Sequence, residues 1–147
     1  MKPTLFVMCG PSHVGKSSLV EGLPAVLISP DAIRRRLGLR FSREDRFVWA
    51  LVRFVKLKTI QHRQDVVLDA CHMSPAARKH AVEGAEGYRK VCVIVEAGLQ
   101  TVEARARKSG RVPIDEVRRM HKAYRRPTLE ELSELGFDEV QVVETQP

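Results

Sequence analysis

With 147 residues, 44% of them hydrophobic and 29% charged, the chain has the size and composition of one soluble globular domain. It contains no apolar run near the roughly 18 residues of a membrane span and no signal-peptide pattern, so we expect a cytoplasmic protein with no membrane partner. The formal net charge of +7 favours an anionic partner such as nucleic acid, although a nucleotide alone would explain part of it.

The first predicted strand, the helix after it and the loop between them carry the clearest functional signal. Residues 4–9 form a short apolar run that predicts a buried strand, and residues 16–21 predict the first turns of a helix. The loop and the start of the helix read Gly10, Pro11, Ser12, His13, Val14, Gly15, Lys16, Ser17 and Ser18, which contain the pattern G-x-x-x-x-G-K-[ST]. Successive N–H groups of such a loop surround a polyphosphate, and the helix N-terminus adds its positive end. We therefore predict a P-loop that binds ATP or another nucleoside triphosphate.

Particular residues of this loop have definite expected roles. Gly10 and Gly15 permit backbone conformations that a side chain would forbid. Lys16 would reach the β- and γ-phosphates, and the hydroxyl of Ser17 would hold Mg²⁺. The alternative is a glycine-containing turn that binds nothing, which the position after the first strand disfavours.

The rest of the chain continues to alternate between strand and helix. Further strands are expected at residues 25–29, 65–70, 91–96 and 139–143, and helices at about 30–37, 43–64, 76–85, 99–107, 113–125 and 128–135. Ser42 is expected to open the long second helix of this series, and Gly87 to stop the third, which Ser74 caps. Five strands joined by helical crossovers predict one α/β domain over residues 1–147, with a parallel sheet covered on both faces.

The residues that follow the second strand are candidates for chemistry, because ligands of open α/β sheets bind beyond the carboxyl ends of the strands. Asp31 and Arg34 are one helical turn apart and project from the same face. A carboxylate there can accept the proton of an attacking hydroxyl, and an arginine can bind a phosphate through two hydrogen bonds. The alternative is that Asp31 only caps its helix and that Arg34 is a solvated surface charge.

Asp69 ends the apolar run of the third strand, where a Walker-B-type carboxylate would lie. It is a candidate for holding Mg²⁺ through a water molecule, or for orienting Arg34 or Lys16. The alternative is that Asp69 caps the turn that follows the strand.

The segment from residue 105 to residue 111 is basic and contains a glycine. Arg107 and Arg111 have the i, i+4 spacing that would bring both guanidinium groups over one phosphate if the helix continues. Mobile arginines of this kind form a lid that stabilises charge on a transferring phosphoryl group. The alternative is a solvated basic helix end that interacts with the helix dipole.

The cysteines and the one tryptophan are expected to be mainly structural. Cys9, Cys71 and Cys92 have no C-x-x-C spacing and lie in or just after apolar runs, so we expect small core residues in a reducing compartment. Trp49 lies on the long helix. We expect its side chain to pack against the protein, and the alternative is that it stacks on a nucleobase.

These residues resemble the polynucleotide 5′-hydroxyl kinase family of P-loop phosphotransferases, as found in phage and bacterial end-healing enzymes. The resemblance covers nearly the whole chain and rests on residues 10–18, 28–34, 67–70, 74–79, the arginine segment, 112–117, 120–122 and 136–140. It implies a P-loop kinase-type three-layer sandwich with a five-stranded parallel sheet and an arginine-bearing lid.

The resemblance also implies roles for individual residues. The general base of the family on the 5′-hydroxyl falls on Asp31, its phosphate-contacting arginine on Arg34, and its strand-end aspartate on Asp69. The two lid arginines fall best on Arg107 and Arg111.

Three features depart from the usual pattern of the family. Arg105 competes for the place of the first lid arginine, because the loop is short here. Cys71 and His72 after the third strand, and His13 with Val14 inside the P-loop, replace the residues that are usual at these positions. These departures leave the choice of acceptor more open than nucleotide binding.

The resemblance thus implies ATP-dependent and Mg²⁺-dependent transfer of a γ-phosphate to a 5′-hydroxyl end of DNA or RNA. One alternative is a P-loop kinase that phosphorylates a small-molecule hydroxyl, such as that of a nucleoside, a sugar or an antibiotic. A second alternative is a non-catalytic nucleotide-binding module.

Overall fold

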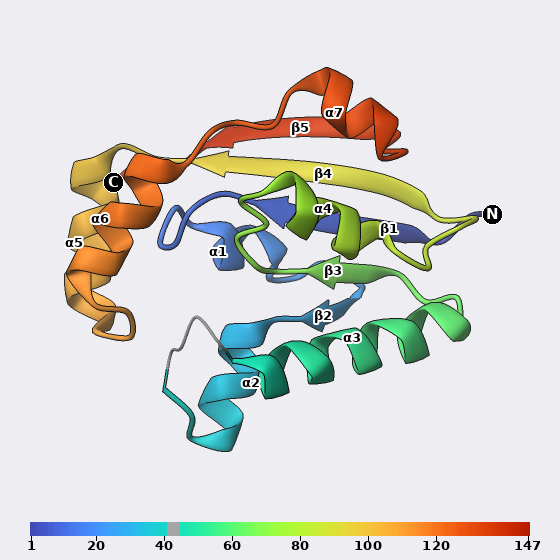
Figure 1. The fold of residues 1–147 in the computed structure, drawn as a ribbon, viewed down its shortest axis with the longest axis horizontal. Coiled ribbons are helices and arrows are strands. Elements are labelled where there is room, and N and C mark those ends of the chain that lie inside the picture. Colours follow the sequence, from blue (N-terminus) through green and yellow to red (C-terminus); the bar gives the residue numbers. More distant parts are fainter. Residues whose placement is uncertain (41–44) are drawn as a thin grey trace.

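A computed structural model of the chain describes residues 1–40 and 45–147. Its elements are β1 (Thr4–Cys9), α1 (Lys16–Val20), β2 (Val26–Ile28), α2 (Pro30–Leu37), α3 (Arg46–Gln61), β3 (Val66–Leu68), α4 (Pro75–Val82), β4 (Arg89–Glu96), α5 (Leu99–Ser109), α6 (Ile114–Ala123), α7 (Leu129–Glu134) and β5 (Glu139–Glu144). The strands form one sheet in the order β2-β3-β1-β4-β5, and every neighbouring pair is parallel (Figure 1). The predicted α/β fold with a five-stranded parallel sheet is therefore confirmed.

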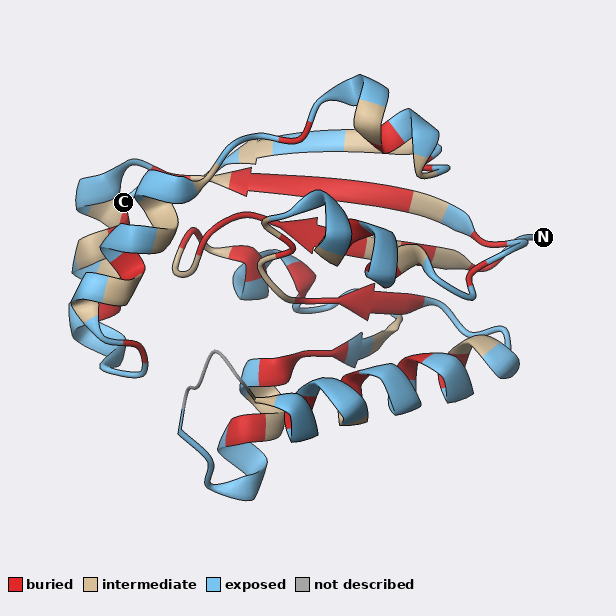
Figure 2. Ribbon diagram, viewed as in Figure 1, coloured by how far each residue is buried: buried red, intermediate tan, exposed pale blue. Residues whose placement is uncertain are grey.

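Alternating side chains of the strands produce the two layers of helices. On β1, Leu5 and Val7 belong to a buried cluster that includes residues of α3, α4 and α7, whereas Met8 belongs to a second cluster with residues of α1, α5 and α6. Successive side chains of a strand point to opposite faces, so a strand covered on both faces is apolar throughout. Figure 2 shows this for β4, whose central residues are all buried. The three-layer arrangement follows from this pattern.

Local capping signals set most helix boundaries. Ser29 caps α2 by accepting a hydrogen bond from the Ala32 amide at 3.2 Å, and Gly38 ends this helix with a φ of 71°. Ser74 caps α4 as predicted, but the expected stop at Gly87 is wrong, because the helix ends at Val82.

The start of α3 also differs from the prediction. The structure begins the helix at Arg46, with Asp45 as its N-cap, and the Oδ1 of Asp45 accepts a hydrogen bond from the Val48 amide at 3.4 Å. The predicted cap, Ser42, lies outside the described residues. An aspartate is a good N-cap because its carboxylate satisfies a free amide and complements the helix dipole.

The strand order places a crevice beyond the carboxyl end of β1. The chain adds β2 and β3 on one side of β1 and β4 and β5 on the other, so the direction of winding reverses there. Figure 1 shows α2, α5 and α6 at this end of the sheet, together with the loop that joins β1 to α1. The candidate residues that follow β1, β2 and β3 therefore share one edge.

None of the described helices combines the length and apolarity that a membrane crossing requires.

Candidate active site

The loop between β1 and α1 has the backbone of a phosphate-binding loop. Gly10 has a φ of 147°, and a side chain there would clash with the carbonyl oxygen of Val95, so the position requires glycine. Gly15 has a φ of 101° and is directly followed by the first residue of α1. The Gly10 amide donates to the Cys71 carbonyl at 2.9 Å, which ties the start of the loop to the segment after β3. The loop thus packs tightly against its neighbours and leads into a helix N-terminus.

Lys16 is buried inside this loop. Its Nζ donates hydrogen bonds to the carbonyl oxygens of Gly10 at 2.9 Å and Pro11 at 2.7 Å, and lies 3.9 Å from the Sγ of Cys71. The ammonium group is thus held by hydrogen bonds within its own loop. Phosphate oxygens are stronger acceptors than these carbonyls, so Lys16 is positioned to exchange its loop contacts for a polyphosphate.

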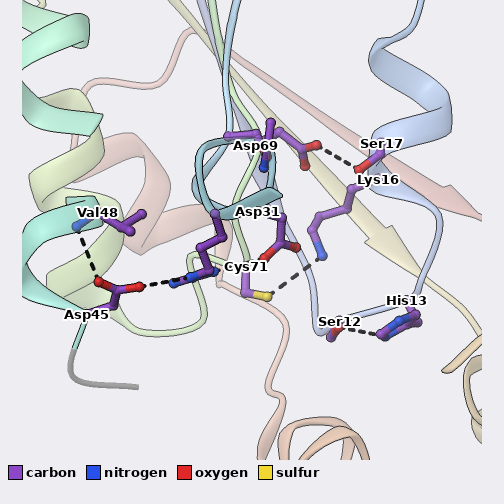
Figure 3. Close-up of polar contacts among 12 residues, drawn as sticks. Ser12, His13, Lys16, Ser17, Asp31, Asp45, Val48, Asp69 and Cys71 are labelled. Atoms are coloured by element: carbon purple, nitrogen blue, oxygen red, sulfur yellow. Dashed lines mark hydrogen bonds and ion pairs between the residues drawn. The ribbon is translucent and has the colours of Figure 1, made fainter. Parts of the chain in front are cut away.

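Ser17 and Asp69 form a pair that fits a magnesium ion. The Ser17 hydroxyl donates to the Oδ2 of Asp69 at 2.8 Å, as Figure 3 shows, so the carboxylate is directed at the P-loop and not at the following turn. Burial raises the pKa of Asp69, while the bond from Ser17 and the charge of Lys16 lower it. Mg²⁺ prefers such oxygen ligands and is usually completed by water and substrate phosphates. Among residues 1–40 and 45–147, no group of three or more His, Cys, Asp or Glu side chains is arranged to hold a metal.

Asp31 and Arg34 are paired, as the predicted spacing requires. The Nη1 of Arg34 lies 2.9 Å from the Oδ1 of Asp31, and its Nε lies 3.2 Å from the Oδ2 of Asp45. Arg34 is only 7% exposed, so the alternative of a solvated surface charge is wrong. Ser29 caps α2, so Asp31 is not the helix cap. The side chain of Asp31 is 54% exposed and available to a ligand.

The carboxylate of Asp31, the ammonium of Lys16 and the carboxylate of Asp69 converge near Cys71. Burial raises the pKa of the Cys71 thiol, Lys16 lowers it, and Asp31 and Asp69 raise it further. Figure 3 shows the side chains of these three residues, which come from α1, α2 and the segment after β3, on the same side of the sheet end as Cys71. Cys71 is partly exposed in this space, so its expected place in the core is wrong, whereas Cys9 and Cys92 are buried as predicted.

A cleft of about 650 Å³ joins the P-loop to the helices around it. Its wall consists of Ser12, Ile28, Pro30, Asp31, Arg34, Trp49, Val52, Arg53, Lys56, the segment from Leu68 to Met73, Ala77, His80, Ala81, Glu83, Val112, Glu116, Arg119 and Met120. Asp31 and Asp69 thus line the same cavity as the P-loop residue Ser12. This volume is in the range of ordinary ligand sites.

The basic segment after α5 is arranged differently from the prediction. The helix ends at Ser109, and Gly110 follows it with a φ of 63°, so the helix does not continue to Arg111. Arg107 and Arg111 therefore do not share one helical face. Arg107 is exposed and pairs with Glu103, 3.3 Å away, one turn earlier on α5.

Arg105 is the arginine of this segment that touches the P-loop. Its Nη1 donates to the His13 carbonyl at 3.3 Å and to the Thr145 hydroxyl at 3.1 Å, and its Nη2 donates to the Gln146 carbonyl at 2.7 Å. Arg105 thus fastens the end of the chain to the loop. The charge of Arg111 also acts on His13, whose pKa is lowered first by burial and then by Arg111.

Helix α6 is anchored beside the cleft by the end of β4. The Tyr124 hydroxyl donates to the Oε2 of Glu96 at 2.6 Å, and the Nε of Arg126 donates to the same oxygen at 3.0 Å. The hydrogen bond from Arg126 lowers the pKa of Glu96 despite partial burial, so its carboxylate remains charged. This anchor holds the residues of α6 that face the cleft, Glu116, Arg119 and Met120.

Several site residues were not predicted from the sequence. Asp45 links Arg34 to the N-terminus of α3, and its position just before an apolar helical pattern was the available signal. Arg53 and Arg119 line the cleft without belonging to any motif. Trp49 lines the cleft and is 43% exposed, so it is not a core residue.

Comparison with known proteins supports the fold and the loop. The sequence matches the family described as AAA domain over residues 5–127, which is most of the chain. No curated protein matches the chain.

Solved structures of low sequence identity share the fold. A candidate kinase from Chloroflexus aurantiacus J-10-fl is 15% identical with a TM-score of 0.70, and the alignment covers 98% of this chain and 86% of that one. A chain of the Pnkp1/Rnl/Hen1 RNA repair complex is also 15% identical with a TM-score of 0.70, covering 83% of this chain but 44% of that one. The APS kinase CysC of Mycobacterium tuberculosis is 21% identical with a TM-score of 0.62, covering 96% and 88%.

Proposed function

This chain belongs to the AAA domain family, and from its kinase-type P-loop fold we propose that it transfers the γ-phosphate of ATP to the 5′-hydroxyl end of DNA or RNA. One observation carries the proposal: the carboxylate of Asp31 lies in the same cleft as the P-loop and Asp69. A base for the acceptor and a cradle for the donor therefore face one space, as an in-line transfer requires.

In the proposed reaction the acceptor hydroxyl gives its proton to a carboxylate oxygen of Asp31. The hydroxyl oxygen then forms a bond to the γ-phosphorus while the bond from that phosphorus to the bridging oxygen breaks, and ADP leaves. Arg34 supports this step by its 2.9 Å contact with Asp31, which fixes the orientation of the carboxylate. The buried Arg34 is itself oriented by Asp45, so Asp45 helps to position Asp31 through Arg34.

The phosphates of ATP would be held by the loop from Gly10 to Ser18. Lys16 would exchange its carbonyl partners for β- and γ-phosphate oxygens, which its position within the loop supports. Ser17 and Asp69 would hold Mg²⁺, which neutralises negative charge on the phosphates.

The basic segment would supply further positive charge to the transferring group. Arg105 would stabilise the P-loop through its contact with the His13 carbonyl. Arg107 and Arg111 are the candidates for a mobile lid, because Arg107 is exposed and Arg111 follows a glycine turn at the end of α5. Removing one such donor typically slows transfer by roughly 10²–10³-fold.

A small-molecule acceptor is the second candidate. A volume of about 650 Å³ also suits a drug-sized ligand, and proteins of similar fold include an APS kinase. The net charge of +7 and the partly exposed ring of Trp49 in the cleft favour a polyanion with bases.

The test is incubation with ATP labelled at the γ-phosphate and a panel of acceptors. The panel holds 5′-hydroxyl DNA and RNA oligonucleotides, the same oligonucleotides carrying a 5′-phosphate, free nucleosides and small sugars. We expect label only on the 5′-hydroxyl oligonucleotides, with a KM that rises steeply with salt because several phosphates are contacted. Label on a nucleoside or sugar alone would replace the polymer by a small molecule, and label on no acceptor would favour a nucleotide-binding module.

A further inference from the structure

Helix α3 contributes an aromatic side chain and a cationic side chain to the wall of the cleft, and the two are one helical turn apart. Trp49 and Arg53 are one helical turn apart on α3, and both line the cleft. Their neighbours Val48 and Val52 are buried, which fixes the orientation of the helix. Trp49 nevertheless keeps 43% of its surface exposed, an unusual degree for a large indole that also lines a cavity.

Arg53 differs from the other cations of the cleft in its contacts. Lys56 donates to the His80 carbonyl at 2.7 Å, Arg119 pairs with Glu116 at 2.6 Å, and Arg34 is held by two aspartates. Within the described part of the chain, Arg53 makes no hydrogen bond or ion pair. Its guanidinium group therefore has all its donors available to an anion in the cleft.

We propose, on the basis of the proposed function, that Trp49 and Arg53 form a subsite for the acceptor strand. Trp49 stacks on the base of the 5′-terminal nucleotide, and Arg53 binds the phosphate that joins this nucleotide to the next. Four residues of helix rise about 6 Å, so one nucleotide can contact both side chains. This subsite makes the proposed substrate more specific: it requires a single-stranded end, because only there are the bases free to stack on a side chain.

The chemistry of the wall suits the base of a nucleotide. The lining of the cleft also includes Val52, Met73, Ala77 and Ala81, which offer an apolar surface to a ligand. The face of a base needs no hydrogen-bond partner, so such a surface suits the base that would stack on Trp49.

The experiment measures KM and kcat for labelled transfer to short 5′-hydroxyl DNA oligonucleotides of three kinds. One is unmodified, one lacks the 5′-terminal base, and one has a neutral methylphosphonate as its first linkage. With the unmodified strand, we expect Trp49→Ala and Arg53→Gln each to raise KM about ten-fold with a much smaller change in kcat. Trp49→Phe and Arg53→Lys should recover most of the affinity.

The modified strands show whether each side chain contacts the group assigned to it. For wild type, each modified strand should have a KM about ten-fold above that of the unmodified strand. Trp49→Ala should cause no further loss with the abasic strand, and Arg53→Gln none with the methylphosphonate strand. Phe54→Ala and Arg46→Gln change exposed residues of α3 outside the cleft and are the matched controls, expected to retain the wild-type KM.

Failure of the subsite is distinguishable from failure of the proposed function. One result against the subsite is that wild type labels the strands but Trp49→Ala and Arg53→Gln keep the wild-type KM. A second is that the KM increase of each variant multiplies with the KM increase of its matching modified strand. In either case the subsite is wrong and the kinase proposal stands. If wild type labels a small molecule and no strand, the polynucleotide activity and the subsite both fall. If a variant does not fold by circular dichroism, the wild-type comparison of the three strands decides alone, and equal KM values would overturn the subsite.

Discussion

The site has two halves that are built in different ways: the phosphate half is the P-loop with Asp69, and the acceptor half is the part of the cleft lined by residues of α2, α3, α4 and α6. In the phosphate half, short hydrogen bonds satisfy the polar groups: Lys16 bonds to carbonyl oxygens of its own loop, and Ser17 bonds to Asp69 after the neighbouring strand β3. In the acceptor half, α2, α3, α4 and α6 contribute from distant parts of the chain. Within the described residues, Arg53 makes no hydrogen bond or ion pair, although its charge acts on Glu83. In the proposed reaction the phosphate half holds ATP, and the acceptor half still has hydrogen-bond donors for a second substrate, so we expect the choice of substrate to depend on the acceptor half.

The largest expected effect on turnover comes from a substitution in the acceptor half alone. Asp31→Asn keeps the size of the side chain but removes the proton acceptor, so turnover should fall roughly 10²–10⁴-fold while the Kd for ATP stays unchanged. Steady-state transfer and isothermal titration on the same preparation measure the two quantities. Asp115→Asn is the matched control, because this side chain on α6 is 94% exposed and lies outside the cleft. Wild-type turnover in Asp31→Asn would remove the base assignment.

Breaking the phosphate half should affect ATP as well as turnover. Lys16→Ala removes the buried ammonium group, so we expect kcat/KM for ATP to fall by roughly 10²–10³-fold and ATP binding to weaken. Binding of an oligonucleotide without ATP should not change, which fluorescence anisotropy checks. Lys79→Ala removes the same charge from the exposed face of α4 and serves as the control. An unaltered ATP affinity in Lys16→Ala would contradict the assigned cradle.

A smaller effect is expected from the link between Arg34 and α3. Asp45→Ser keeps a capping oxygen for α3 but removes the carboxylate 3.2 Å from Arg34. Turnover should fall about ten-fold, the equivalent of one charge-assisted hydrogen bond of about 1.5 kcal/mol. Asp45→Ala should lose the cap as well and cost about 1 kcal/mol of stability in urea unfolding. Equal turnover in Asp45→Ser and wild type would mean that Asp45 does not position the base.

The last prediction concerns the stability of the fold and not activity, and it rests on His72 in the segment after β3. Burial lowers the pKa of His72 to about 4 from 6.5, and its Nδ1 lies 2.6 Å from the Met8 carbonyl oxygen. Between these values the unfolded chain binds a proton that the folded chain does not, so stability falls as pH falls from 6.5 towards 4, by at most ~3 kcal/mol. Asp69, whose pKa burial raises, acts in the opposite direction.

The comparison with a variant isolates the contribution of His72. Asn tolerates the positive φ of 44° at this position and does not titrate, so His72→Asn should flatten the pH dependence of urea unfolding in this window. An identical slope in wild type and variant would show that His72 does not contribute to the pH dependence.

The P-loop of the phosphate half could be predicted from the sequence because its residues lie close together in the chain. The glycines at 10 and 15, the lysine and the serine follow one another within eight residues, and the apolar run before them specifies a buried strand. The shared edge of Asp31 and Asp69 was also predictable, because the carboxyl ends of parallel strands meet there.

The part of the acceptor half that α3 contributes could not be predicted, because it depends on tertiary packing. The exposure of Trp49 and the position of Arg53 in the wall of the cleft follow from how α3 lies against the sheet, which no short pattern encodes. The i, i+4 spacing of Arg107 and Arg111 was misleading, because Gly110 takes a left-handed conformation and ends the helix between them.

The most direct test of the account is a double-mutant cycle between the two halves. Single-turnover transfer from labelled ATP to a 5′-hydroxyl oligonucleotide is measured for wild type, Lys16→Ala, Asp31→Asn and the double variant. Residues that act as one catalytic unit are strongly non-additive, so we predict that the double variant is within about ten-fold of the slower single variant. A double variant that loses the full product of the two single losses would show that Lys16 and Asp31 act independently, and would contradict a single shared site.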